Sequence, residues 1–320
     1  MWYRFLGTVW LCGTWVLGTV ADQPADAPPE KLTVAVSILP QAHFVERVGG
    51  ERVRVIVLVG PGQSPHAYEP TPKQVAELAG AQAYFTIGVE FERGILPRLR
   101  SSFPKLRIVD TRAGVPLRTM TRTETSTECD HGHDHGYHDH QGTPDPHIWL
   151  SPRLVRIQAQ TIGDALAALD PPGAETYRRK LADFQADLDR LHDRLEAAFA
   201  GLKGREVFVF HPAFGYFLDE FGLRQIPVEI EGKEPTARQL ATVIERAKAA
   251  GVRVIFVQPQ FSRKSAEAVA EAISGVVVPL DPLARDFTAN LEDIAAKIQA
   301  KFAPPDAAAE SGTRPKDQTP

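Results

Sequence analysis

The chain contains very little cysteine. Its 320 residues include 2 cysteines, and Cys12 lies in an apolar segment near the N-terminus that we expect to be cleaved off. Cys129 would then be the sole cysteine of the mature chain, which excludes an intrachain disulfide. Its position beside five histidines suggests contact with a soft metal, although an exposed thiol fits equally well.

An excess of basic residues is also absent. Lys and Arg together number 36 against 40 Asp and Glu, which gives a formal net charge of −4. No segment of the chain forms a basic stripe. Nucleic acid is therefore not an expected partner.

Long apolar runs are missing after residue 20. Residues 5–20 are apolar or small, follow a sparse positive start at Arg4, and precede a small-x-small site formed by Thr19 and Ala21. We therefore predict a cleaved signal peptide over 1–21 and export to the periplasm, with no membrane insertion of the mature chain. A transmembrane anchor is the alternative, but the run is short for a span of about 20 residues.

Strand and helix patterns alternate in two blocks after a polar leader at 22–31. The strand-like runs are 32–38, 53–59, 83–87, 107–109, 206–210, 225–230, 252–258 and 275–280. Such alternation predicts an α/β fold with parallel sheets. We expect an N-terminal β/α lobe over 32–172, a linking helix over 173–201, a C-terminal β/α lobe over 202–303 and a disordered tail over 304–320. Ligands of such folds bind at the carboxyl ends of strands, here in a cleft between the lobes.

The linking helix carries the longest helical pattern in the chain. Its apolar residues recur every three or four positions and form one stripe: Tyr177, Leu181, Phe184, Leu188, Leu191, Leu195 and Phe199. At 1.5 Å per residue the helix would be about 40 Å long, and we expect it to be a rigid connection between the lobes. His192 falls on its polar side, so we expect this histidine to be solvated rather than a ligand.

Histidines are concentrated in one stretch. Five of the ten lie in a loop over about 113–146 that has no periodicity; they are His131, His133, His135, His138 and His140. A short His-rich tract is a compositional signal for metal. Because a flexible loop offers no fixed geometry, we interpret it as a secondary element that captures or senses metal. A hydrated insertion without function is the alternative.

Three further histidines occupy strand ends or a loop that leads into a helix. His66 stands in GQSPHAYEPTP, His147 in DPHIWLSP and His211 in VFVFHPAFGYF. Each alone would more often be a packed or exposed residue, but together they could supply much of a tetrahedral zinc site. Asp281, in VVVPLDPLARD, is the natural fourth ligand, and a turn carboxylate before Pro282 is its alternative role. His43 is ambiguous.

These phrases, together with EIEGKEPTARQL and VIFVQPQFS, resemble the solute-binding proteins of zinc-uptake ABC transporters, in the cluster that also contains manganese-binding relatives. The resemblance spans nearly the whole mature chain. It implies two lobes joined by a rigid helix and ligands at His66, His147, His211 and Asp281. Manganese-binding members carry a glutamate where His211 stands. Some zinc members carry an acidic residue where this chain has Pro65, which leaves the fourth position open between Asp281 and water.

The predicted function is therefore capture of Zn²⁺ in the periplasm by a monomer, which delivers the ion to an ABC permease and its ATPase. Two other functions are alternatives. A zinc hydrolase is disfavoured because the chain lacks H-E-x-x-H and shows no evident base beside an open metal position. A metal buffer or metallochaperone without a transporter stays open, as do secondary or packing roles for Glu69, Trp149, Glu229 and Glu231.

Overall fold

The structure is a computed structural model that describes residues 31–120, 144–228, 236–261 and 263–302. The predicted signal peptide, most of the leader, the tail and the five loop histidines lie outside the described residues. So do Cys129, Glu229 and Glu231. Among the described helices, none is both long enough and apolar enough to cross a membrane.

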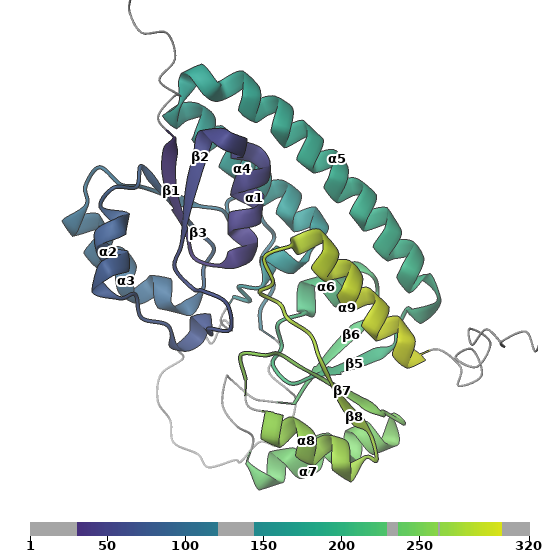
Figure 1. The fold of residues 1–320 in the computed structure, drawn as a ribbon. Coiled ribbons are helices and arrows are strands. Elements are labelled where there is room, and N and C mark those ends of the chain that lie inside the picture. The colour runs from purple at the N-terminus through teal and green to yellow at the C-terminus, as the bar shows by residue number, and fades with distance from the viewer. Residues whose placement is uncertain (1–30, 121–143, 229–235, 262, 303–320) are drawn as a thin grey trace, which may run out of the picture. The chain divides into compact units, whose positions relative to one another are not determined.

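The N-terminal lobe is built on a parallel sheet with strand order β2-β1-β3-β4 (Figure 1). The strands are β1 (Leu32–Val36), β2 (Val53–Val57), β3 (Ala83–Thr86) and β4 (Arg107–Asp110), and the helices are α1 (Leu39–Gly49), α2 (Pro72–Leu78), α3 (Glu90–Ser102) and α4 (Pro152–Leu169). Every residue of β1 and β3 is buried. Strands covered on both faces are typical of a parallel sheet in an α/β protein.

The C-terminal lobe repeats this topology in a second parallel sheet with the order β6-β5-β7-β8. Its strands are β5 (Glu206–Val209), β6 (Arg224–Pro227), β7 (Val254–Val257) and β8 (Val276–Pro279), and its helices are α6 (Gly215–Glu220), α7 (Ala237–Ala249), α8 (Arg263–Ala272) and α9 (Phe287–Phe302). The prediction of two parallel β/α sheets is confirmed.

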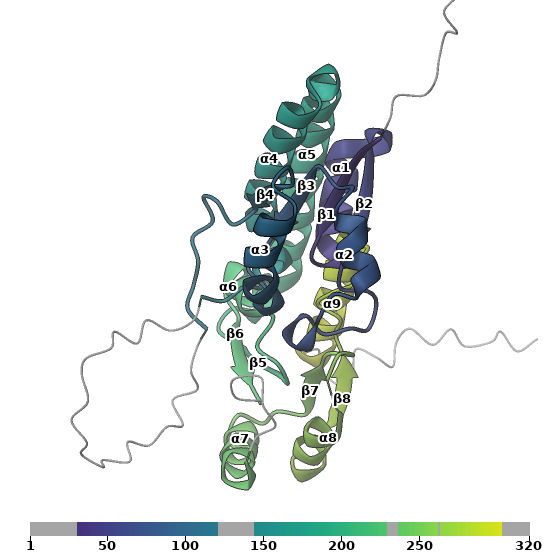
Figure 2. The ribbon, with the colours of Figure 1, turned by 90° about the vertical axis from the view of Figure 1, so that its left-hand side faces the viewer.

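The long helix α5 (Ala174–Phe199) runs for 26 residues and buries the whole predicted apolar stripe. It packs against α1 and α4 of the N-terminal lobe and against α9 of the C-terminal lobe (Figure 2). Ion pairs join it to both sides, since Asp187 pairs with Arg47 of α1 and Arg194 pairs with Glu292 of α9. The helix therefore links the two lobes as predicted.

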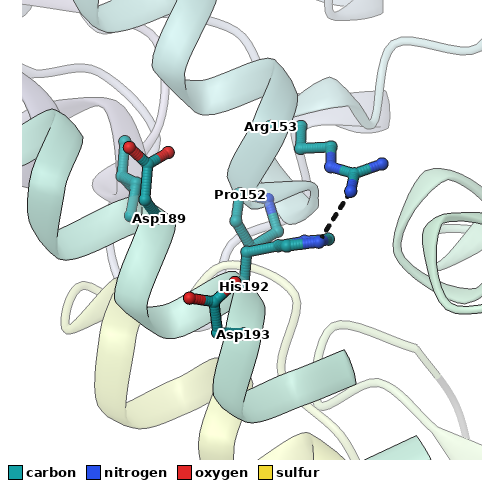
Figure 3. Close-up of a pocket in the computed structure, with 6 residues that line it drawn as sticks. Pro152, Arg153, Asp189, His192 and Asp193 are labelled. Atoms are coloured by element: carbon teal, nitrogen blue, oxygen red, sulfur yellow. Dashed lines mark hydrogen bonds between the residues drawn. The ribbon is translucent and has the colours of Figure 1, made fainter. Parts of the chain in front are cut away.

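His192 corrects the sequence prediction, because it is 8% exposed rather than solvated. Its ring stacks on Phe221 and its Nδ1 lies 2.7 Å from Glu220 Oε1, so α6 covers this part of α5. Arg153 Nη2 lies 2.8 Å from Nε2 (Figure 3). Arginine can only donate, so Nε2 accepts and Nδ1–H donates to Glu220.

Candidate metal centre

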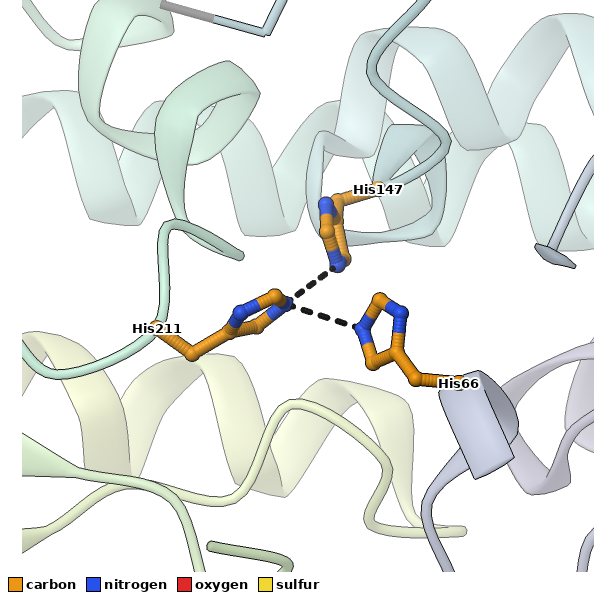
Figure 4. A group of neighbouring side chains, drawn as sticks. All are labelled: His66, His147 and His211. Atoms are coloured by element: carbon orange, nitrogen blue, oxygen red, sulfur yellow. Dashed lines mark hydrogen bonds between the residues drawn. The ribbon is translucent and has the colours of Figure 1, made fainter. Parts of the chain in front are cut away.

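Three histidines that are far apart in the sequence meet between the lobes: His66, His147 and His211 (Figure 4). We call them the histidine cluster. His211 Nε2 lies 3.1 Å from His66 Nε2 and 3.3 Å from His147 Nε2. Tetrahedral zinc with Zn–N bonds of about 2.0–2.1 Å requires nitrogens about 3.3 Å apart. Two of the three spacings therefore match edges of a zinc tetrahedron, and all three ligand nitrogens lie within 4.8 Å of one another.

A short turn after β2 carries His66. The 3-10 turn η2 (Pro65–Ala67) begins with proline, whose missing N–H costs nothing at this position, and the Ser64 side chain accepts a hydrogen bond from His66 N. His66 Nδ1 lies 3.6 Å from Glu90 Oε2, at the start of α3. At this distance the contact is too long for a hydrogen bond, and the Glu90 side chain is 68% exposed.

His147 is held by a carboxylate two residues earlier in the chain. Asp145 Oδ1 accepts hydrogen bonds from His147 N at 3.0 Å and from the ring Nδ1 at 2.7 Å. Because an ionised carboxylate only accepts, Nδ1 carries the ring proton and Nε2 presents its lone pair to the cluster. Sequence reasoning missed Asp145, although an aspartate that bonds the backbone two residues on is a recognised turn signal.

His211 follows the end of β5, where the strand ladder stops, and a buried glutamine continues the pairing. His211 N donates to Gln258 Oε1 at 3.1 Å, and Gln258 Nε2 donates to His211 O at 2.6 Å. The imidazole stacks on Phe261 with ring centroids 4.7 Å apart. Gln258 and Phe261, two residues of the segment that follows β7, thus position this histidine, and neither was assigned a role from the sequence.

Asp281 does not share the cluster's close geometry, because among the residues that the structure describes the group of converging ligand atoms consists of the three histidines alone. Its Oδ1 accepts hydrogen bonds from Gln260 Nε2 at 2.8 Å and from Leu283 N at 2.9 Å. The second bond is the turn arrangement considered as its alternative role. Whether Asp281 binds the metal stays a prediction.

The cluster borders a cavity of about 20 Å³. Besides the histidines, its lining includes Trp149, Gln260 and Phe261. Trp149 has the packing role considered from the sequence: its Nε1 donates to Pro282 O and its ring lies beside His147. Glu69 is exposed and is not a member of the cluster. The site is small, mostly buried and built for one small ion.

Comparison with known proteins gives a consistent result. Residues 34–303 match the family described as zinc-uptake complex component A, periplasmic (ZnuA). The chain is 30% identical over 261 residues to the high-affinity zinc uptake system protein ZnuA of Bacillus subtilis strain 168, with 81% of each chain covered. It is 30% identical over 253 residues to a putative metal-binding protein of Treponema pallidum strain Nichols, with 78% of each covered.

Solved structures show the same likeness. A crystal structure of ZnuA superposes with a TM-score of 0.78 at 40% identity and covers 86% of this chain and 100% of that one. A zinc-bound deletion mutant of ZnuA superposes with a TM-score of 0.77 at 40% identity and the same coverage.

Proposed function

Because this chain belongs to the ZnuA family of periplasmic zinc-uptake components, it is a substrate-binding protein that captures Zn²⁺ and not an enzyme, and we propose that His66, His147 and His211 bind the ion through their Nε2 atoms. The observation that carries this proposal is the convergence of three imidazole nitrogens within 4.8 Å of one another, with two of the three pairs at zinc-like spacing.

The donor set favours zinc over manganese. Imidazole is a ligand of intermediate softness that suits zinc, whereas manganese prefers carboxylate, carbonyl and water oxygens. His147 and His211 are each 3% exposed, so water has little access to two of the three rings. His147 is also oriented in advance by Asp145, as metal-bound histidines usually are by an outer carboxylate.

The origin of the ligands suggests how zinc is held. His66 and His147 belong to the proposed N-terminal lobe (32–172) and His211 to the proposed C-terminal lobe (202–303). A bound ion would therefore bridge two parts that α5 already connects through packing on both sides. We expect binding and release to require small loop movements rather than a wide opening of the lobes.

The remaining parts of the proposal concern the route of the metal. As an uptake component, the protein would act as a monomer and deliver zinc to an ABC permease driven by its ATPase, after export through a signal peptide at 1–21. The histidines His131, His133, His135, His138 and His140 would raise the local zinc concentration as a secondary metal loop. A multidentate but flexible loop binds more weakly than a preorganised site, because each binding mode must order the chain.

Single replacement of each cluster histidine by alanine tests the proposal. Zinc affinity is measured on the full chain by competition with a chelator strong enough to keep the loop histidines empty. Each replacement should lower the affinity by about 100-fold or more, since a bond to the ion is lost. His192→Gln is the matched control, because His192 is buried outside the cluster, and it should retain the affinity. Full affinity in all three alanine variants would place the tight site elsewhere.

A further inference from the structure

The Gln260 side chain lies at the histidine cluster with its amide held in one orientation. It lines the same cavity as the three histidines, and its Nε2 donates to Asp281 Oδ1 at 2.8 Å. A carboxylate offers only acceptors, so the amide nitrogen must face Asp281. The usual ambiguity between the nitrogen and oxygen of a glutamine amide is thereby removed, and Oε1 must lie on the other branch of the amide.

Gln260 Oε1 is buried and has no hydrogen-bond partner among the residues that the structure describes. Buried acceptors without a donor are rare, because removing them from water costs free energy that no protein contact returns. Of the buried side-chain atoms in this condition, Gln260 Oε1 belongs to the one residue that lines the metal cavity. A side chain that lines the cavity thus holds a buried acceptor that lacks a donor.

Asp281 is already engaged in holding this arrangement. Its Oδ1 accepts from both Gln260 Nε2 and Leu283 N, and its carbonyl oxygen accepts from Asn290 Nδ2 at 2.7 Å. These bonds tie the carboxylate to its own turn and to Gln260. The carboxylate is also absent from the group of converging ligand atoms.

Three imidazoles supply three of the four positions that zinc takes in a tetrahedral site. A water in the fourth position would be polarised by the ion and would become a strong hydrogen-bond donor. The cavity of about 20 Å³ has room for roughly one water molecule. A zinc-bound water would thus supply the hydrogen-bond donor that Gln260 Oε1 lacks.

We propose that Zn²⁺ bound by the histidine cluster carries a water in its fourth position, that Gln260 Oε1 accepts a hydrogen bond from this water, and that Asp281 positions Gln260 instead of binding the metal. The inference rests on the proposed function, since it needs zinc at the cluster. In this arrangement Gln260 is a positioning residue for the zinc-bound water, which is an exchangeable ligand. Release of the ion would then break three imidazole bonds and no bond to an anionic side chain.

Two substitutions separate this arrangement from direct binding by Asp281. Gln260→Leu removes the acceptor and keeps a side chain of similar bulk. Asp281→Asn keeps Oδ1 as an acceptor for both Gln260 and Leu283, so it preserves the amide orientation while removing the charge. Gln160→Leu, the same change at an exposed position of α4, is the matched control.

Zinc affinity of the full chain is measured by chelator competition, and visible absorption of the Co²⁺-loaded protein reports the geometry of the site. Gln260→Leu should weaken zinc binding by about 10-fold, the lower end for loss of an outer partner, and should change the cobalt spectrum. Asp281→Asn should weaken binding by less than about threefold, and its spectrum should match the parent's. Thermal unfolding of the zinc-free variants identifies any loss of folding.

An unchanged affinity and cobalt spectrum in Gln260→Leu overturns the inference. So does an Asp281→Asn variant that loses as much affinity as the histidine variants, because Asp281 would then be a ligand. Either result leaves the proposed function intact while His66→Ala, His147→Ala and His211→Ala still lose zinc. Retention of zinc by those three variants would instead refute the proposed function itself.

Discussion

Asp145 Oδ1 accepts hydrogen bonds from both the backbone N–H and the ring Nδ1 of His147. Asp145 is 1% exposed, and its other oxygen lies 3.6 Å from Arg118 Nε. The Tyr216 hydroxyl of α6 in turn donates to the Asp145 carbonyl oxygen at 3.1 Å. The orientation of a histidine in the N-terminal lobe is therefore supported from the C-terminal lobe.

Replacing Asp145 should weaken zinc binding through His147. Asp145→Ala removes both hydrogen bonds to His147 and should lower zinc affinity by about 10- to 100-fold. Asp145→Asn keeps an acceptor for them but no charge, and its loss should be smaller. Chelator competition measures both, with Asp189→Asn on the exposed side of α5 as the control. Equal affinity in Asp145→Ala and the parent would show that this carboxylate does not orient the ligand.

Gln258 should affect both stability and binding. Gln258→Leu removes the acceptor of the buried His211 N–H, at a cost of about 1–3 kcal/mol. The His211 carbonyl oxygen loses Gln258 Nε2 but still accepts from Ala213 N at 2.8 Å. Urea unfolding of the zinc-free protein should therefore show a loss of about 1 kcal/mol or more. Zinc affinity should fall as well, because His211 is no longer fixed. The idea fails if the unfolding free energy stays within about 0.5 kcal/mol of the parent.

His43 predicts a pH dependence of stability. Burial lowers the pKa of His43 from its ordinary 6.5, Arg47 and Arg285 lower it further, and Asp286 acts in the opposite direction. The unfolded chain then binds this proton more readily than the folded one, so the contribution to stability is present above pH 6.5. It is lost as the pH falls from that value through the lower folded-state pKa.

His43→Leu should flatten this dependence. Urea unfolding of zinc-free protein at about pH 7.5 and about pH 5.5 brackets the ordinary histidine pKa. The parent should lose more stability between the two than the variant does. Since His43 Nε2 has no hydrogen-bond partner among the described residues, leucine breaks no such bond. Parallel pH profiles in the two proteins would mean that His43 does not contribute to the dependence.

Deletion of residues 129–141 should separate the two kinds of zinc binding. The bridge between Thr119 and Pro144 lies outside the deleted segment, as do Asp145 and His147. The tight site should therefore keep its affinity. In an equilibrium titration, the additional zinc ions that the parent binds more weakly should no longer bind. Loss of the tight site on deletion would assign high-affinity binding to the loop.

Much of the fold follows from sequence periodicity. The start of α4 and the boundary between α4 and α5 were predicted almost to the residue. Ser151-Pro152 marks the first, and Pro171-Pro172-Gly173 marks the second. The three histidines were also identifiable, since they stand where strands end or where a helix is about to begin. These features depend on local patterns that a single sequence displays.

The supporting contacts could not be read in the same way. Gln258 and Gln260 act through side-chain amides whose partners lie 47 and 21 residues away in the chain. His192 was misassigned as solvated because helical periodicity describes only its own helix. The packing of α6 against that face, which buries it beside Phe221, is a tertiary effect.

The most direct test of zinc binding at the histidine cluster is the zinc anomalous signal from crystals of the full chain grown with one equivalent of Zn²⁺. We expect a peak about 2.0–2.1 Å from Nε2 of His66, His147 and His211. A principal peak that lacks any one of these three nitrogens would contradict it.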